Sequence, residues 1–149
     1  MAIVISDESK AAWMYHCVEN TGYPTPADWH RQVHLYASAL VLGSTTTLAS
    51  LLSVETGFTG YGYQPLVYGS TPGINSCDQQ VDQFAQVNWT AGGGGANTLC
   101  YGYWVDGLAD GGTRRLLWCE AFPVAQSCLL LGAMISFQPQ LALGQAVPC

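Results

Sequence analysis

The chain has 149 residues, of which 49% are hydrophobic and only 9% are charged, and its formal net charge at pH 7 is −6. This length fits one domain around one core, so we expect residues 1–149 to fold together and do not expect a two-lobed enzyme. Four basic residues stand against ten acidic ones, too few to neutralise nucleic-acid phosphates, and the low charge also excludes disorder driven by charge repulsion.

The apolar segments are too short to cross a membrane. Ala37–Leu42 and Leu129–Phe137 are interrupted well before the roughly 20 residues that a spanning helix requires, so no membrane association is expected. The first ten residues lack a basic region ahead of an apolar run, and we therefore expect synthesis in a cytoplasm without a secretory signal. A surface with so few charges predicts that much of it lies at interfaces.

The N-terminal region has the pattern of a short strand followed by a helix. Ala2–Ile5 is apolar, and Ser6 suits a helix N-cap. Asp7 and Glu8 would then lie in the first turn, where the helix dipole favours negative charge. The helical spacing ends at the glycine and prolines of Asn20–Pro26, which predicts one helix of about three turns.

From Gln32 onward the hydrophobic period changes to two, which predicts a half-buried strand. Its apolar face holds Val33, Leu35, Ala37, Ala39 and Val41, and its other face holds His34, Tyr36 and Ser38. Further strands are predicted at Tyr63–Tyr68, Phe84–Ala91, Thr98–Val105, Arg114–Phe122 and Met134–Leu143, with turns that include Ser70–Asn75 and Gly92–Asn97. The pattern predicts a mainly β fold, an antiparallel β-sandwich or jelly roll with one N-terminal α-helix.

One predicted hairpin bears on the cysteines. The turn Asp106–Gly112 joins two strands, and symmetric folding about it places Cys100 opposite Cys119 or one register away. Directly opposed residues have a Cα separation that a disulfide accepts, so we predict a possible Cys100–Cys119 bridge. None of the six cysteines forms a C-x-x-C pair, and a cytoplasmic origin favours reduced thiols unless the protein later works outside the cell.

The sequence offers little support for a metal, nucleotide or catalytic site. His30 and His34 have the spacing of metal ligands, but without an H-E-x-x-H pattern we interpret them as surface or packing residues. Gly92–Gly95 lacks the Lys-Ser/Thr of a phosphate loop, and no G-x-S-x-G elbow is present. We therefore predict no catalytic residues, no metal and no cofactor.

Two carboxylate pairs resemble calcium ligands or glycosidase acid/base pairs. They are Asp78 with Asp82 and Asp106 with Asp110. Because aspartate is favoured in turns for its geometry, we interpret the second pair as solvated loop residues.

Aromatic residues gather in the predicted β region, where most are expected in the core. Exposed tyrosine and tryptophan also anchor interfaces and stack on sugars, so a carbohydrate-binding module is an alternative. The candidate interface aromatics are Tyr61, Trp89, Tyr103 and Trp104.

Several short motifs, taken in order, span most of the chain. They are Met1–Glu8, Val33–Tyr36, Thr47–Ala49, Glu55–Tyr61, Val87–Trp89, Tyr101–Val105 and Leu116–Pro123. In this order they resemble a family of small structural proteins of tailed bacteriophages.

The resemblance implies a virion component on the capsid exterior, made in the cytoplasm of a host bacterium. It implies a capsid cement or decoration protein that binds the major capsid protein and itself as a homotrimer, with no catalytic residues. A low-charge chain suits this role, because burying apolar area stabilises a symmetric assembly. The alternatives are a tail or baseplate adaptor, a receptor-binding tail protein, and a small glycan-processing enzyme that uses Asp78, Asp82, Asp106 or Glu120.

Overall fold

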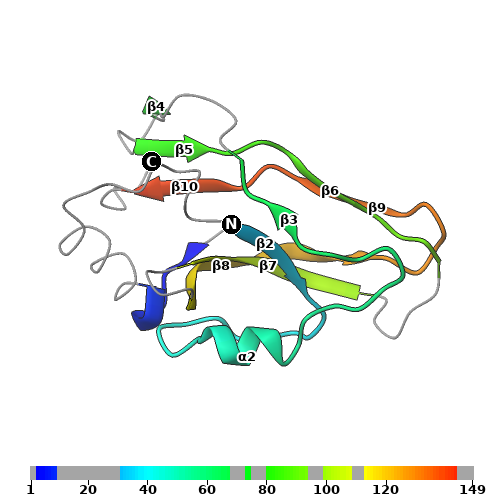
Figure 1. Cartoon of the computed structure of the whole chain (residues 1–149), viewed down its shortest axis with the longest axis horizontal. Coiled ribbons are helices and arrows are strands. Elements are labelled where there is room, and N and C mark those ends of the chain that lie inside the picture. The colour runs from blue at the N-terminus through cyan, green and yellow to red at the C-terminus, as the bar shows by residue number, and fades with distance from the viewer. Residues whose placement is uncertain are drawn as a thin grey trace.

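An antiparallel five-stranded sheet forms the centre of the molecule (Figure 1). The computed structural model of the chain describes residues 3–9, 31–67, 73–74, 80–93, 99–108 and 113–143. The strands of the sheet lie in the order β1-β8-β7-β2-β3, and every neighbouring pair is antiparallel. Their bounds are Ile3–Val4 (β1), Gln32–Tyr36 (β2), Gln64–Pro65 (β3), Leu99–Leu108 (β7) and Arg114–Ser127 (β8). The predicted mainly β, antiparallel class is confirmed.

Two smaller antiparallel sheets, β10-β5-β4 and β6-β9, follow one another and form a long ribbon beside this sheet (Figure 1). In Figure 1, β5 leads into β6 and β9 leads into β10; these two segments run side by side, with β5 paired to β10 and β6 paired to β9. The ribbon is interrupted at Pro139, which has no N–H to donate and whose carbonyl accepts a hydrogen bond from the Phe84 N–H at 3.1 Å. The predicted strand Met134–Leu143 is therefore two strands. The bounds in this region are Gly73–Ile74 (β4, beside β5), Gln80–Gln83 (β5), Val87–Thr90 (β6), Met134–Phe137 (β9) and Gln140–Leu143 (β10).

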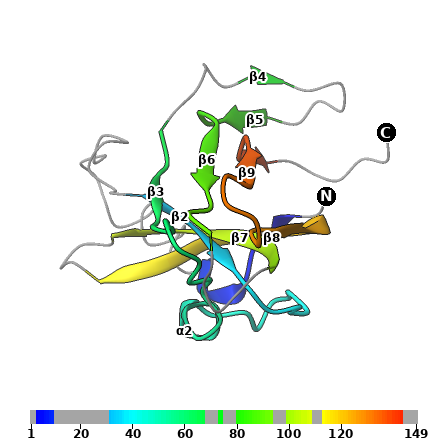
Figure 2. The same cartoon turned by 90° about the vertical axis from the view of Figure 1, so that its right-hand side faces the viewer.

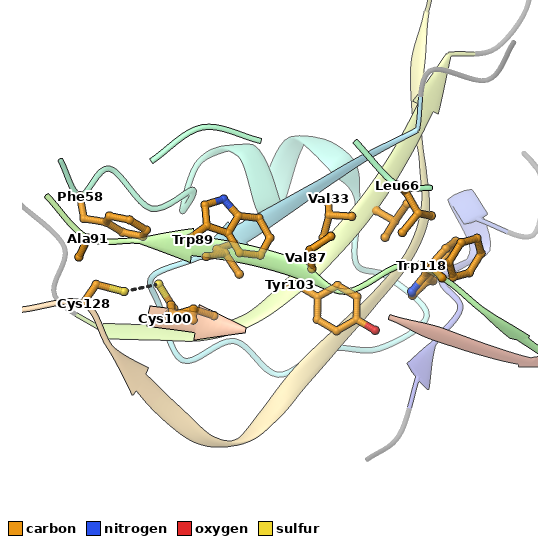
Figure 3. Packing of buried hydrophobic residues seen from close by; sticks show 14 of the residues in the cluster. Val33, Phe58, Leu66, Val87, Trp89, Ala91, Cys100, Tyr103, Trp118 and Cys128 are labelled. Carbon is orange, nitrogen blue, oxygen red and sulfur yellow. Dashed lines mark hydrogen bonds between the residues drawn. The ribbon is translucent and has the colours of Figure 1, made fainter. Parts of the chain in front are cut away.

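Different elements cover the two faces of the five-stranded sheet. Figure 2 shows α2 (Leu48–Leu52) on one side of the sheet and β6 and β9 on the other. The ribbon-side core includes Val33, Leu35, Val87, Trp89, Cys100, Tyr103, Trp118 and Cys128 (Figure 3). The helix-side core consists of Tyr36, Leu48, Leu51, Trp104, Leu116 and Cys119.

Because elements cover both faces of the sheet, β2 is not the half-buried strand that the period-two pattern predicted. His34 and Tyr36 are buried, as the alternating valine and leucine are. The strand also ends at Tyr36, and Val41 is fully exposed. The prediction was wrong about the second face because α2, which covers it, was not expected.

The α2 helix begins with a capping box. The Thr47 side chain accepts from the Ser50 N–H, and the Ser50 hydroxyl accepts from the Thr47 N–H. The Glu8 carboxylate also accepts from the Leu48 N–H at 2.9 Å, so Glu8 stabilises the start of α2 rather than only its own helix.

The predicted N-cap at Ser6 is confirmed. Residues 7–9 are helical, and the Ser9 N–H donates to the Ser6 hydroxyl at 3.2 Å. The rest of the predicted helix lies outside the described residues.

The β7–β8 hairpin contains a wide irregularity that corrects the predicted register. Gly102 pairs with Ala121 but Cys100 pairs with Gln126, so residues 122–125 of β8 lie opposite Tyr101 alone. Pro123 falls in this bulge, where it need not donate to the ladder.

The same register separates the two cysteines that were expected to bridge. Cys119 pairs with Trp104 and belongs to the helix-side core, while Cys100 belongs to the ribbon-side core. Both thiols are free. The predicted Cys100–Cys119 pairing is therefore corrected: the sheet lies between the two side chains.

Candidate functional site

Ionisable side chains meet beneath the helix-covered face of the sheet. We call this group the polar cluster; it consists of His34 (β2), Glu55, Tyr61, Asp106 (β7) and Arg114 (β8). Asp106 is 1% exposed and His34 is 6% exposed. Charges buried to this extent are stable only when they are paired.

His34 is the centre of the polar cluster. Its Nδ1 lies 2.7 Å from Glu55 Oε1, and its Nε2 lies 3.4 Å from Asp106 Oδ2. The ring stacks on Trp104 at a centroid distance of 4.7 Å and an interplanar angle of 6°. These contacts fix the position of the imidazole between two carboxylates.

The two carboxylates have further partners. Asp106 Oδ1 accepts from Arg114 Nε at 2.9 Å and forms an ion pair with the same guanidinium. Glu55 Oε1 accepts from the Tyr61 hydroxyl at 2.7 Å, and that hydroxyl accepts from the Leu35 N–H. The polar cluster thus ties β2, β7 and β8 to the segment that follows α2.

The pKa values respond to this pairing. Burial by itself would lower the pKa of His34, but its contacts with the carboxylates of Asp106 and Glu55 raise it above 6.5. Burial by itself would raise the pKa of both carboxyls. Hydrogen bonds from His34 and Tyr61 nevertheless hold the pKa of Glu55 below 4.5. His34 and Arg114 likewise hold the pKa of Asp106 below 3.8. The raised pKa of His34 favours the protonated imidazole, which together with the Arg114 guanidinium offsets the charges of the two carboxylates.

The arrangement suits a structural role better than acid/base catalysis. A catalytic histidine presents one ring nitrogen to the reacting group while the other is held by an orienting residue. In His34 both nitrogens face carboxylates. Neither nitrogen is left to face a substrate.

Asp106 corrects the sequence interpretation. It was expected in a solvated turn, but β7 continues through it to Leu108, which pairs with Arg114. The alternation of β7 gave the missing signal, because Asp106 is two residues after Trp104 and so shares its face. Its proposed partner Asp110 lies outside the described residues.

The other candidate carboxylates do not join this group. Glu120 is buried, and its Oε2 accepts from the Tyr103 hydroxyl at 2.5 Å. Tyr103 belongs to the ribbon-side core, so Glu120 and Asp106 serve opposite faces of the sheet. Asp82 lies in β5, and Asp78 and His30 lie outside the described residues.

The aromatics proposed as interface anchors lie mainly inside the chain. Trp89 and Tyr103 are each 2% exposed and Trp104 is 0% exposed. Tyr61 is half-buried and directs its hydroxyl into the polar cluster. The expected interface role of Trp89, Tyr103 and Trp104 is corrected, because their rings fill the two cores.

A different surface exposes apolar side chains. The turn from β8 to β9, at the right of Figure 1, exposes four of them over Leu129–Met134, which we call the leucine loop. The exposed fractions are 58% for Leu129, 71% for Leu130, 79% for Leu131 and 62% for Met134. Sequence reasoning noted this stretch only as too short for a membrane span.

The leucine loop is held by backbone hydrogen bonds. The Ala133 N–H donates to the Leu130 carbonyl at 3.0 Å, and Gly132 has φ of 81°, as a type II turn requires at its third position. Ala91 accepts from the Gly132 N–H and donates to the Ala133 carbonyl, both at 2.8 Å. The leucines are therefore presented by an ordered turn.

The sequence matches no family model, and neither the curated proteins nor the solved structures contain a significant match. Among the described residues, no group of three or more His, Cys, Asp or Glu side chains is placed to hold a metal ion. In the same part of the chain, no helix has the length and apolar character needed to span a membrane.

Proposed function

We propose that this chain is a structural protein of a tailed-bacteriophage virion, a capsid cement protein that binds the major capsid protein and assembles as a homotrimer on the outer shell. The order of its motifs resembles such proteins, as set out above. The observation that carries the proposal is the leucine loop, which places three consecutive leucines in solvent on an ordered turn. Contiguous exposed apolar surface marks interaction sites, and an ordered loop loses little entropy on binding.

The use of the polar residues also supports a binding role. His34, Asp106 and Glu120 all have partners within the chain. Asp106 and Glu120, two of the four acids proposed for a glycan-processing enzyme, therefore have a structural role instead. Trp89 and Trp104 are buried, which removes two of the rings that a sugar-binding tail protein would use for stacking.

The mechanism is multivalent. Each copy contributes a modest apolar contact. Because the contact is repeated over the whole shell, the summed binding free energy lets the shell resist internal pressure. Because apolar burial needs no particular charge, the contact is compatible with a chain that is only 9% charged.

The test compares virions that contain and lack the protein. We expect particles without it to assemble but to release DNA at a lower temperature or after a milder osmotic shock. Unchanged robustness of these particles contradicts the cement function.

A matched pair of variants then assigns the contact. Leu130→Asp places a charge in the leucine loop and is expected to lower the copy number per particle by about tenfold or more. Val41→Asp makes the same change at a fully exposed residue beside α2 and is expected to leave the copy number unchanged. Equal copy numbers for both variants contradict the role of the leucine loop.

A further inference from the structure

Two thiols meet at the base of the leucine loop. Cys100 lies near the start of β7, and Cys128 directly follows the last residue of β8. Their Sγ atoms are 3.5 Å apart, as the dashed line in Figure 3 shows. Both belong to the ribbon-side core, Cys100 at 0% and Cys128 at 2% exposure.

The β7–β8 ladder holds the pair together. Leu99 pairs with Ser127 and Cys100 with Gln126, so Cys128 directly follows the paired end of the ladder, two residues after the partner of Cys100. An S–S bond is about 2.05 Å long, and the Sγ atoms therefore need to approach by about 1.5 Å. Side-chain rotation supplies a movement of this size without a change in strand pairing.

We propose that Cys100 and Cys128 form a disulfide that fixes the base of the leucine loop once the protein meets an oxidising environment. The proposal does not depend on the function assigned above. It also replaces the Cys100–Cys119 pairing expected from the sequence, since Cys119 lies on the other face of the sheet.

The chemistry is thiol–disulfide exchange with a small-molecule disulfide. One cysteine thiolate attacks that oxidant, breaking its S–S bond and releasing one small thiol. The second cysteine, as a thiolate, attacks the mixed disulfide and releases the other small thiol. The two cysteines together lose two protons and two electrons, and the oxidant is reduced to two thiols.

The surroundings predict how fast the exchange occurs. Burial raises the pKa of the Cys128 thiol to about 12 and also raises that of Cys100. The thiolate is the nucleophile, so reaction in the folded protein is slow and depends on opening of the loop. Oxidation during folding, when both thiols are accessible, is faster.

The bridge has a measurable effect on stability. It closes a ring from Cys100 to Cys128 that contains the β7–β8 hairpin except Leu99. Ring closure of this length restricts the unfolded chain and is expected to raise Tm by on the order of 10 °C.

To test the proposal, the full chain is folded in a buffer of reduced and oxidised glutathione, starting from both the reduced and the oxidised protein. Free thiols are then alkylated under denaturing conditions without reductant, and tandem mass spectrometry assigns linked peptides. Trypsin cleavage at Arg114 and Arg115 leaves Cys100 in one peptide with Cys77, and Cys128 in another with Cys119 and Cys149, so fragment ions of the linked peptides are needed to identify which two cysteines are joined. We expect a Cys100–Cys128 link and the Tm increase in the oxidised protein.

Two variants complete the design. Cys128→Ala is expected to abolish both the link and the Tm difference between oxidised and reduced protein, while Cys119→Ala is expected to retain both. If Cys128→Ala does not fold, the oxidised and reduced wild-type proteins still provide the comparison. Alkylation of both cysteines at equilibrium in the oxidising buffer, or a link from Cys100 to any other cysteine, overturns the proposal.

Discussion

The polar cluster and the leucine loop reverse the usual placement of polar and apolar side chains. In the polar cluster, His34 and Asp106 are almost completely buried. In the leucine loop, Leu130 and Leu131 are more than two-thirds exposed, at 71% and 79%. The charged side chains of the polar cluster hold strands together by pairing with one another, whereas the leucine loop contributes little to the core. The comparison separates the side chains that stabilise the fold from the surface that we propose to bind a partner.

The largest expected effect comes from breaking the polar cluster. Asp106→Ala removes the buried carboxylate that His34 and Arg114 share, so that His34 keeps only Glu55 as a carboxylate partner. We expect a loss of about 4 kcal/mol in the free energy of unfolding, because a buried ion-pair network loses its most buried carboxylate. Urea denaturation followed by tryptophan fluorescence measures it, and a loss below about 1 kcal/mol contradicts the structural role.

A second effect tests the packing above α2. A Cβ on Gly102 would overlap the Glu120 carbonyl and the Tyr36 ring, whose hydroxyl donates to that carbonyl at 3.3 Å. Gly102→Ala is therefore expected to cost about 3 kcal/mol. In the double variant with Tyr36→Ala, the cost of Gly102→Ala should be smaller, because only the clash with the Glu120 carbonyl remains. Strictly additive costs in the same denaturation assay would rule out the clash with the Tyr36 ring.

The pH dependence of stability sharpens the comparison. His34 has a raised pKa, so its contribution is complete below about pH 6.5 and is lost as pH rises through the folded-state value. Glu55 and Asp106 have lowered pKa values, so their contribution is present above about pH 4.5 and is lost as pH falls through their folded-state values. Stability is thus expected to be greatest between these limits.

His34→Gln provides the control for this profile. The variant should lose the decline above pH 6.5, as measured by Tm in a series of buffers. A decline of equal slope in the variant would assign the effect to other groups.

The smallest effect on stability is expected in the leucine loop. Leu130→Ser changes a side chain that is 71% exposed, and we expect the free energy of unfolding to change by less than about 0.5 kcal/mol. The same denaturation assay used for Asp106→Ala measures it. A loss as large as that of Asp106→Ala would show that the leucine loop belongs to the core, and would remove the contrast with the polar cluster.

Much of the fold could be predicted from the sequence, because the long strands show their period. The strand from Thr98 and the strand from Arg114 correspond to β7 and β8, and Ser6 is an N-cap as expected. The α2 helix was missed, since it has only five residues and its capping box uses Ser50 in place of glutamate or glutamine. Without that helix, the second face of β2 could only be assigned to solvent.

The polar cluster could not be predicted, because its members are brought together by pairing between distant strands. His34 and Glu55 are 21 residues apart, and no spacing rule connects them. The bulge around Pro123 likewise shifts the register that places Cys100, and a symmetric hairpin cannot reveal it. The leucine loop was visible as an apolar stretch, but its exposure depends on the turn at Gly132.

The central claim is that the leucine loop is the contact through which this chain binds a virion shell. A cryo-EM map of purified virions tests it most directly. The account predicts many copies of the fold at local symmetry axes on the capsid exterior, with Leu129–Met134 buried against the shell or a neighbouring copy. Density in a few copies on the tail, no density at all, or a capsid-bound copy whose leucine loop faces solvent would contradict it.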